Sequence, residues 1–269
     1  MAKELSGTIA FVTGSGRGLG RVMAERLAEL GADVAIHDLD WTAPAKYGEA
    51  ENLGEVAKAI EKYCVRTTAV TGNIGDPAAV AKMRADIEQK LGPVDVLVNC
   101  AGGDIGAQGG KPLPNNALDI PIEDVQALVN NNLIGTIIVC KTFAVPMRER
   151  GRGVVINLAS AAAHLGVSDG AIYGTLKAAV AHYTRCLAKE LMNDGVRVNA
   201  VSPGPTKTAR FQATRKVDPA KMDSNIKSFD RYAEPSEIAD AVAFLAGPRS
   251  KFINGQVIRV DGGITLWPG

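Results

Sequence analysis

Short apolar runs alternate with longer stretches of helical periodicity along the whole chain. The runs are continuous and rich in Val and Ile, as in parallel strands that are covered on both faces. They span residues 8–13, 34–37, 65–71, 94–99, 154–159, 196–201 and 256–260. The helical stretches between them span about 19–30, 52–62, 77–91, 122–150, 170–192 and 235–246. This order of elements predicts an α/β fold with a doubly wound, seven-stranded parallel sheet and helices on both faces.

No internal repeat, low-complexity tract or shift in composition marks a second domain, so we expect residues 1–269 to form a single domain. Two segments interrupt the alternation. Residues 102–114 carry five glycines and two prolines, and residues 207–231 carry seven basic residues against three aspartates. Both follow the carboxyl ends of predicted strands, where open α/β sheets bind ligands. They predict substrate-side loops around 102–121 and 205–232.

The composition excludes several classes of protein. With 30 Lys and Arg against 29 Asp and Glu, the net charge is +1, and the chain lacks the basic balance of a nucleic-acid binder. No apolar run reaches the roughly 18 residues of a membrane span, and the first residues do not read as a secretory signal. The four cysteines and three histidines are too scattered to suggest a disulfide framework or a metal site. We expect a compact cytoplasmic protein without a nucleic-acid partner, a membrane partner or a metal.

A glycine-rich turn, TGSGRGLG over 13–20, directly follows the first predicted strand and opens the first helix. Glycines such as Gly14, Gly18 and Gly20 let backbone N–H groups approach a pyrophosphate, and the helix N-terminus favours its negative charge. The second predicted strand ends at Asp38, 18 residues beyond Gly20, near the distance at which an acid hydrogen-bonds the adenosine ribose. The sequence therefore predicts a Rossmann-type dinucleotide site.

Two side chains near the ribose indicate different cofactors. Asp38 repels a 2′-phosphate and favours NAD, whereas Arg17 offers a guanidinium that could pair with the phosphate of NADP. Asp38 carries more weight because its carboxylate accepts from both ribose hydroxyls. NAD is the predicted cofactor, and the use of NADP stays open.

Tyr173 and Lys177 share one face of a predicted helix because they are four residues apart. A free phenol has a pKa of about 10, and a neighbouring ammonium lowers that pKa. Such a phenol can exchange a proton with an alcohol or carbonyl oxygen. A Tyr and a Lys at this spacing are common by chance, but here they are joined by Ser160 at the end of a strand and by the glycine-rich turn.

With these motifs, the chain resembles the short-chain dehydrogenase/reductase family, in its compact single-domain branch, over almost its full length. The glycine pattern of the family matches at 13–20, and its catalytic serine matches thirteen residues before the tyrosine. Cys100 stands where the family has a second Asn. The other matching positions are Asn99, Ala101, Gly102, Asn132, Pro203, Gly204, Thr208 and the terminal turn 261–263.

The resemblance implies a mechanism for alcohol oxidation. Tyr173, as phenolate, takes the hydroxyl proton while hydride leaves the carbinol carbon for the nicotinamide. Ser160 hydrogen-bonds the reacting oxygen. Lys177 lowers the pKa of Tyr173 and holds the nicotinamide ribose, and Asn132 anchors a water that relays protons from Lys177 to solvent.

The motifs and the resemblance also imply a set of cofactor contacts. Asn73 stands where the family often has Asp and can still hydrogen-bond the adenine, and Ile74 is expected beside the ring. Thr206 and Thr208 are expected to meet the nicotinamide carboxamide. The complete set is Gly14, Arg17, Gly18, Leu19, Gly20, Asp38, Asn73, Ile74, Asn99, Ala101, Gly102, Tyr173, Lys177, Pro203, Gly204, Thr206 and Thr208. For His164, a wall or surface position is favoured over a role in substrate binding.

The motifs and the resemblance fit three functions. The leading one is an NAD-dependent dehydrogenase that acts on a secondary alcohol or ketone, such as a polyol, a sugar derivative or a hydroxy acid. The alternative is an NADPH-dependent 3-oxoacyl-carrier-protein reductase, which Arg17 and the basic segment support and which Asp38 and the long loop disfavour. A remote alternative is a dinucleotide-binding protein without catalysis, although Ser160, Tyr173 and Lys177 are all present. The charge of segment 207–231 is interpreted as a solvated face in preference to an anion site.

The resemblance implies a homotetramer. The helices at 122–150 and 170–192 are candidate pairing surfaces, and burial in the core is the competing explanation of their apolar faces. The C-terminal residues 266–269 are expected either to cover the cleft of a neighbouring subunit or to fray.

Overall fold

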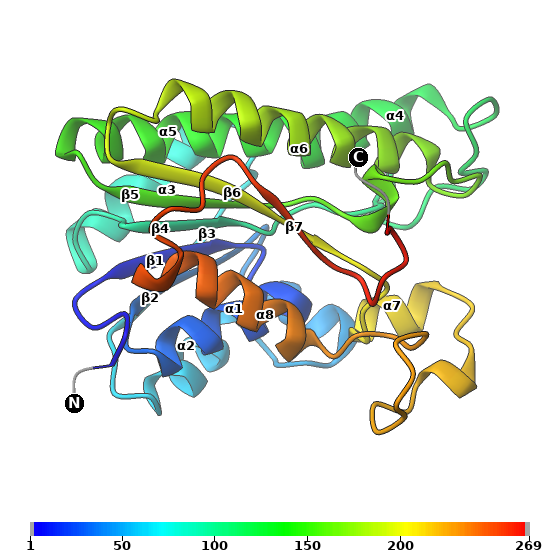
Figure 1. Ribbon diagram of the computed structural model, residues 1–269, viewed down its shortest axis with the longest axis horizontal. Coiled ribbons are helices and arrows are strands. Elements are labelled where there is room, and N and C mark those ends of the chain that lie inside the picture. The colour runs from blue at the N-terminus through cyan, green and yellow to red at the C-terminus, as the bar shows by residue number, and fades with distance from the viewer. Residues whose placement is uncertain (1–2, 267–269) are drawn as a thin grey trace.

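The computed structural model describes residues 3–266. Its centre is a seven-stranded parallel sheet with the order β3-β2-β1-β4-β5-β6-β7 (Figure 1). The strands are β1 (Ile9–Thr13), β2 (Asp33–Asp38), β3 (Thr67–Thr71), β4 (Val96–Asn99), β5 (Gly153–Leu158), β6 (Val196–Pro203) and β7 (Val257–Val260). The strand order reverses between β1 and β4, which is where sheets of this kind open a ligand crevice. The predicted fold class is confirmed, while residues 267–269 of the predicted C-terminal segment 266–269 lie outside the described residues.

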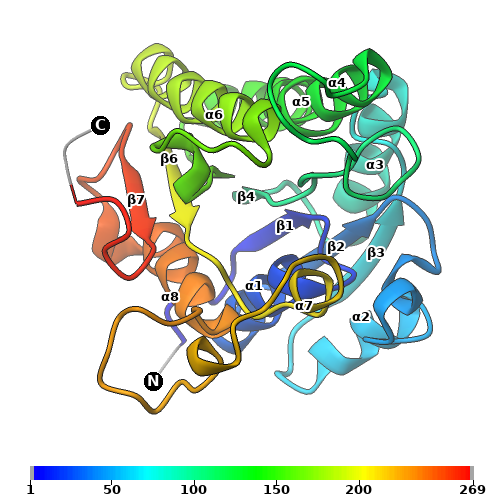
Figure 2. The ribbon, with the colours of Figure 1, turned by 90° about the vertical axis from the view of Figure 1, so that its right-hand side faces the viewer.

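Helices cover both faces of the sheet (Figure 2). One layer consists of α1 (Gly18–Glu29), α2 (Leu53–Glu61) and α8 (Pro235–Ala246). The opposite layer consists of α3 (Pro77–Lys90), α4 (Ile122–Val129), α5 (Gly135–Arg150) and α6 (Ala171–Glu190). Each layer has its own apolar cluster, so the sheet is buried on both sides.

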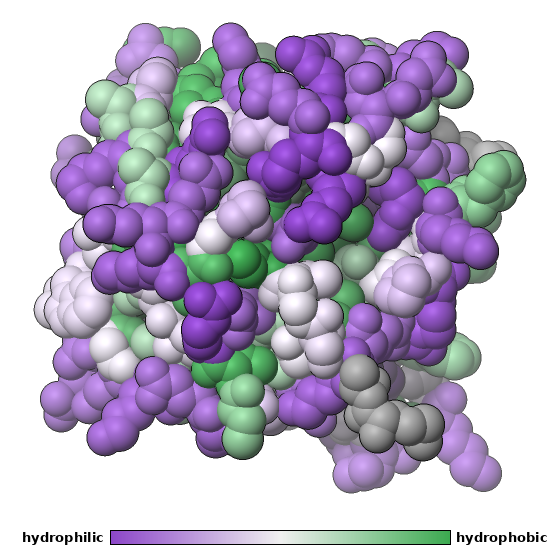
Figure 3. Space-filling model, turned by 90° about the vertical axis from the view of Figure 1, so that its left-hand side faces the viewer, coloured by the Kyte–Doolittle hydropathy of each residue, from purple (hydrophilic) through white to green (hydrophobic). Residues whose placement is uncertain are grey.

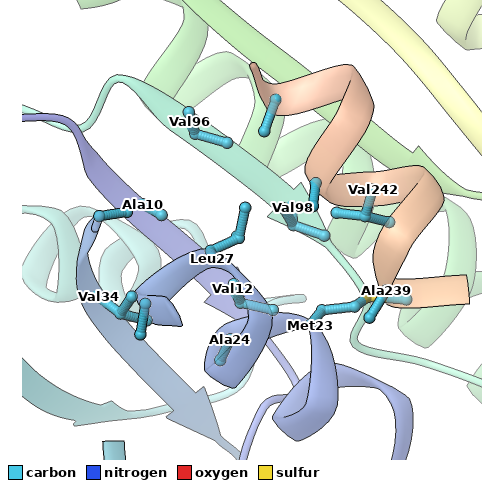
Figure 4. Close-up of a cluster of buried hydrophobic side chains, with 14 of the residues drawn as sticks. Ala10, Val12, Met23, Ala24, Leu27, Val34, Val96, Val98, Ala239 and Val242 are labelled. Carbon is cyan, nitrogen blue, oxygen red and sulfur yellow. The ribbon is translucent and has the colours of Figure 1, made fainter. Parts of the chain in front are cut away.

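The strand β1 shows why these apolar runs fold as buried parallel strands. All five of its residues are buried, and successive side chains enter opposite layers. Ala10 and Val12 belong to the cluster under α1 and α8, where Leu27 and Val242 meet them (Figure 4). Phe11 belongs to the other cluster. Both faces of β1 pack against apolar helices, so neither face can be polar. This explains why its apolar run is continuous.

The predicted helix 122–150 is one continuous helix that contains a π-helical turn. A π-helical turn at Asn130–Ile134 separates α4 from α5, and Pro146 lies inside α5. Among the described residues, Ile122–Arg150 is the one helix long and apolar enough to cross a membrane by length and composition, and 44% of its most apolar window is buried in this fold. The turn was not predicted from sequence, and such turns often occur at functional sites.

Two loop regions lie over the carboxyl ends of the strands (Figure 2). Residues 100–121 form neither helix nor strand. The segment expected to be irregular at 205–232 contains the short helix α7 (Ala209–Thr214), which Thr208 caps by accepting a hydrogen bond from the Phe211 amide at 3.1 Å. At the opposite end of the sheet, the surface is mainly hydrophilic with small separate apolar patches (Figure 3).

Candidate active site

A cavity of about 630 Å³ opens at the carboxyl ends of the strands, within the usual size of ligand pockets. Its wall combines the ends of β1, β2, β4, β5 and β6 with both loop regions. Most of the residues predicted from sequence line it: Gly14, Arg17, Gly18, Leu19, Gly20, Asp38, Asn73, Ile74, Ala101, Gly102, Ser160, Tyr173, Lys177, Pro203, Gly204, Thr206 and Thr208. The fold thus brings together positions that are up to 194 residues apart in the chain, from Gly14 to Thr208.

The glycine-rich turn packs so closely that side chains would not fit. A Cβ on Gly20 would lie 2.1 Å from the carbonyl oxygen of Gly14. A Cβ on Gly14, which has a φ of +64°, would lie 2.8 Å from the Cα of Ala101. The Thr13 hydroxyl accepts hydrogen bonds from the Cys100 and Ala101 amides at 3.0 and 3.1 Å, which joins the turn to the end of β4.

His37 hydrogen-bonds the glycine-rich turn, a role that the sequence did not predict. The Gly14 amide donates to His37 Nδ1 at 3.1 Å, and His37 Nε2 lies 2.9 Å from the Gly72 carbonyl oxygen. This pattern requires the neutral ring with its proton on Nε2. Burial lowers the pKa of His37, which favours the same form. A histidine in an apolar strand was the only signal in the sequence.

A carboxylate already occupies the mouth of the turn. Glu49 Oε2 accepts a hydrogen bond from the Gly18 amide at 2.8 Å, at the first residue of α1. The turn therefore presents a backbone donor to an anion, at a helix end whose dipole favours negative charge. Together with the glycine cradle, this contact shows that the residues present suit the pyrophosphate of a dinucleotide.

The two residues that indicate different cofactors face one another. Arg17 Nε lies 3.9 Å from Asp38 Oδ2, and this nitrogen has no hydrogen-bond partner. The Arg17 guanidinium also lies 4.9 Å from the ring centroid of Tyr47, which comes from a 3₁₀ turn that the sequence did not reveal. Nearby, Asn73 and Ile74 line the cavity as expected for the adenine end.

Three of the four predicted catalytic residues, Ser160, Tyr173 and Lys177, meet at the other end of the cavity. Ser160 follows β5 and lines the same wall as Tyr173 on α6, close enough for its hydroxyl to act on the pKa of the phenol. Lys177 lies one turn further along α6, with its Nζ 5.8 Å from the ring centroid of Tyr173. That Nζ donates to the Leu158 carbonyl oxygen at 2.8 Å and is almost completely buried. The expected constellation is therefore assembled.

The electrostatics of this group differ from the prediction. Burial raises the pKa of Tyr173, and the hydrogen bond from Ser160 and the positive charge of Arg210 act in the lowering direction. Lys177 was expected to lower that pKa, but its ammonium is turned toward Leu158, and burial lowers its own pKa to about 8. The phenol is therefore protonated at neutral pH in this structure.

Two predicted residues lie beside the cavity and not in its wall. Asn132, in the π-helical turn, accepts from the Gly103 amide at 2.8 Å and donates to the carbonyl oxygens of Gly103 and Leu128. Asn99 donates to the Asn157 side chain at 2.9 Å, between two central strands. Their side chains position the cavity wall, and the cofactor contact of Asn99 stays a prediction. The proton relay through Asn132 stays a prediction.

The segment after β6 forms the remaining wall. Gly204 packs on the terminal turn, where a Cβ would lie 2.8 Å from the Cα of Asp261. Thr206 donates to the Gly204 carbonyl oxygen at 2.8 Å. His164 is not among the wall residues, and its Nε2 lies 3.1 Å from the Ser202 hydroxyl. His164 is half-buried, and its lack of a role in substrate binding stays a prediction.

Charged side chains from three loops close the substrate side. Arg215 lies 3.0 Å from Asp104 and 3.4 Å from Asp169. Lys111 lies 2.5 Å from Asp169, and the Asn115 amide donates to both carboxylates. This network, which we call the loop clasp (Asp104, Lys111, Asn115, Asp169 and Arg215), connects the segment around α7 to the loop after β4 and to the loop before α6.

Comparisons with known proteins agree with the site. A family model described as enoyl-(acyl carrier protein) reductase matches residues 14–265. Cyclohexanol dehydrogenase of Rhodococcus sp. (strain TK6) is 34% identical over 97% of both chains. Meso-2,3-butanediol dehydrogenase of Serratia marcescens is 33% identical, covering 97% of this chain and 96% of the relative. The crystal structure of a gluconate 5-dehydrogenase from Burkholderia cenocepacia J2315 in complex with NADP and tartrate matches with a TM-score of 0.81, 31% identity and 98% coverage of both chains.

Proposed function

This chain belongs to the short-chain dehydrogenase/reductase family, and from that premise we propose that it is an NAD-dependent dehydrogenase of secondary alcohols. It is an oxidoreductase of alcohols and ketones. The observation that carries the proposal is the assembly of Ser160, Tyr173 and Lys177 at one end of a cavity whose other end is the glycine-rich turn. The nucleotide end and the proton-transfer end are thereby parts of one site.

The side chains divide the chemistry between them. When bound, a nicotinamide accepts hydride from the carbinol carbon or returns it to a ketone. Ser160 and Tyr173 hold the reacting oxygen by hydrogen bonds, and Tyr173 exchanges its proton with that oxygen. The positive charge of Arg210 favours the phenolate that alcohol oxidation needs. Because burial raises the pKa of Tyr173, we expect oxidation to accelerate as the pH rises, while ketone reduction uses the protonated phenol directly.

The preference for NAD rests on Asp38. Its carboxylate lines the cavity at the end of β2, where it can accept from both ribose hydroxyls and would repel a 2′-phosphate. Arg17, held between Asp38 and Tyr47, supports the second candidate, an NADPH-dependent reductase of acyl groups on a carrier protein. The description of the matching family model points in that direction as well.

A panel of cyclic alcohols, vicinal diols, polyols and hydroxy acids, each offered with NAD⁺ and with NADP⁺, separates these functions through the absorbance of the reduced nicotinamide. We expect kcat/KM to be at least about tenfold higher with NAD⁺, which corresponds to about 1.4 kcal/mol. A preference of that size for NADP⁺, with turnover of 3-oxoacyl thioesters, would replace the first candidate by the second.

We also propose that the protein works as a homotetramer in the cytoplasm. Apolar side chains on the helix Ile122–Arg150 support the pairing, since Ile122, Ile134 and Val145 are 68%, 38% and 42% exposed in the single chain. Light scattering would measure the assembly directly.

A further inference from the structure

One cation on the cavity wall has no acid partner. Arg210 lies in the first turn of α7, and its Nη1 donates to the Gly102 carbonyl oxygen at 3.3 Å. Its guanidinium lies against Gly103, where a Cβ would come within 2.5 Å of Nη2. These contacts fix the plane of the group against the backbone that follows β4. No carboxylate of the described residues forms an ion pair with it.

The other cations of the wall are occupied. Arg17 faces Asp38, and Lys111 and Arg215 belong to the loop clasp. Lys177 is buried beneath Tyr173 and donates to a backbone carbonyl. Within the described part of the chain, Arg210 is thus the one cavity-lining cation that has neither a carboxylate partner nor a predicted catalytic role.

Arg210 also differs from the other basic residues of the segment 207–231. Four of its seven basic residues pair with acids, namely Lys207 with Glu234, Arg215 with Asp104, Lys221 with Asp230 and Arg231 with Glu237. Of the three others, Lys216 and Lys227 are exposed and do not line the cavity. The charge of the segment, which the sequence suggested was a solvated face, therefore reaches the cavity through Arg210.

Arg210 lines the same cavity as Tyr173 and Lys177. Its charge acts on both Tyr173 and Lys177, in the direction of a lower pKa for each. Asp104 also lines the cavity, but its carboxylate is already engaged by Arg215 and Asn115. The neighbouring Phe211 packs edge-on against Tyr232 at 5.0 Å between centroids, so α7 is anchored and does not simply swing in solvent.

We propose that Arg210 binds the carboxylate of the substrate, and that the substrate is therefore a hydroxy acid and its product an oxo acid. This inference rests on the proposed function and narrows its substrate class. A guanidinium presents two parallel N–H donors that match a carboxylate. With the carboxylate on Arg210, the hydroxyl reaches Ser160 and Tyr173. The hydride then goes from the carbinol carbon to oxidised nicotinamide and the hydroxyl proton to the Tyr173 phenolate, which leaves the ketone of the oxo acid.

Matched acids and amides test this assignment. The substrates are 2-hydroxy-, 3-hydroxy- and 4-hydroxypentanoate with their primary amides, which differ from the acids in charge and hardly in size. For the best position of the hydroxyl, we expect kcat/KM to favour the acid by about 100-fold, the size of a charge-assisted bidentate contact. Arg210→Met should reduce that preference to near one. Arg210→Lys keeps the positive charge but lacks the two parallel N–H donors of the guanidinium. It should leave a preference of about tenfold for the acid over the amide.

Lys216→Met is the matched control. Lys216 lies six residues after Arg210 and is exposed, so this variant removes one positive charge outside the cavity. It should keep the full preference for the acid over the amide. Thermal melting checks the fold of each variant, and if Arg210→Met is unfolded the Lys variant decides. Equal use of acid and amide by the wild type overturns the inference while the proposed function stands. Oxidation of neutral secondary alcohols but of none of the three hydroxypentanoates would likewise overturn the inference and leave the proposed function standing. Failure to oxidise any secondary alcohol with either cofactor would instead overturn the proposed function.

Discussion

The cofactor half and the substrate half of the cleft are formed by different parts of the chain. The cofactor half consists of strand ends and glycine backbone, held by hydrogen bonds of buried groups such as Thr13 and His37. The substrate half consists of side chains from three loops, held by the ion pairs of the loop clasp, several of which are partly exposed. Backbone geometry cannot vary without breaking the fold, whereas ion pairs between loops can be exchanged. Binding of the nucleotide and choice of substrate are therefore separable in this molecule.

The largest difference in effect is expected between one glycine of the cofactor half and one of the substrate half. Gly20→Ala places a Cβ 2.1 Å from the Gly14 carbonyl oxygen, so we expect the free energy of unfolding to fall by about 3 kcal/mol and cofactor binding to be lost. Gly110→Ala on the substrate side meets no atom within 4 Å and should be tolerated. Thermal melting and titration with NADH check both variants. Equal effects of the two changes would contradict the distinction between the halves.

Cofactor choice should change without any change in substrate. Asp38→Ser removes the charge that repels a 2′-phosphate and leaves Arg17 free to bind it, so the ratio of kcat/KM for NAD⁺ over NADP⁺ should fall by about 100-fold. Asp40→Ser, at an exposed position two residues further on, is the control and should leave the ratio as it is. An unchanged ratio in Asp38→Ser would show that Asp38 does not read the ribose.

The loop clasp should affect the substrate alone. Arg215→Met removes the ion pairs to Asp104 and Asp169, and we expect KM for the substrate to rise about tenfold because the loops lose their fixed positions. The free energy of unfolding should fall by about 1–3 kcal/mol, because the almost buried Asp104 carboxylate loses its ionic partner. High salt should raise KM of the wild type in the same direction. If NADH binding weakened as much as substrate binding, the halves would not be independent.

Acid should loosen the cofactor half first. Burial lowers the pKa of His37 below its ordinary value of 6.5, so the unfolded chain binds a proton that the folded chain refuses. The stability that this histidine contributes is present above pH 6.5 and is lost as the pH falls, at a slope of at most about 1.4 kcal/mol per pH unit. His37→Gln should flatten the dependence of the melting temperature on pH between 7 and 5, while the exposed His182→Gln should not.

The sequence predicts the cofactor half better than the substrate half, for a physical reason. Glycines at a strand-to-helix turn, an acid at the end of β2 and a Tyr-Lys pair on a helix are local patterns, and each determines its own geometry. Tyr47 and Glu49 reach the cavity from an irregular segment, so their contacts depend on tertiary packing that has no local pattern. The same holds for Arg210, since the sequence shows a run of basic residues but not which acids from other loops neutralise them.

The most direct measurement compares the wild type with Tyr173→Phe in two assays on the same preparations. One is oxidation of a secondary alcohol that the wild type turns over, and the other is binding of NADH. Because Tyr173 is the proton-transfer group, we predict a loss of about 1,000-fold in kcat with an unchanged Kd for NADH. Oxidation at the wild-type rate by Tyr173→Phe would contradict the account of this cleft as the site of alcohol oxidation.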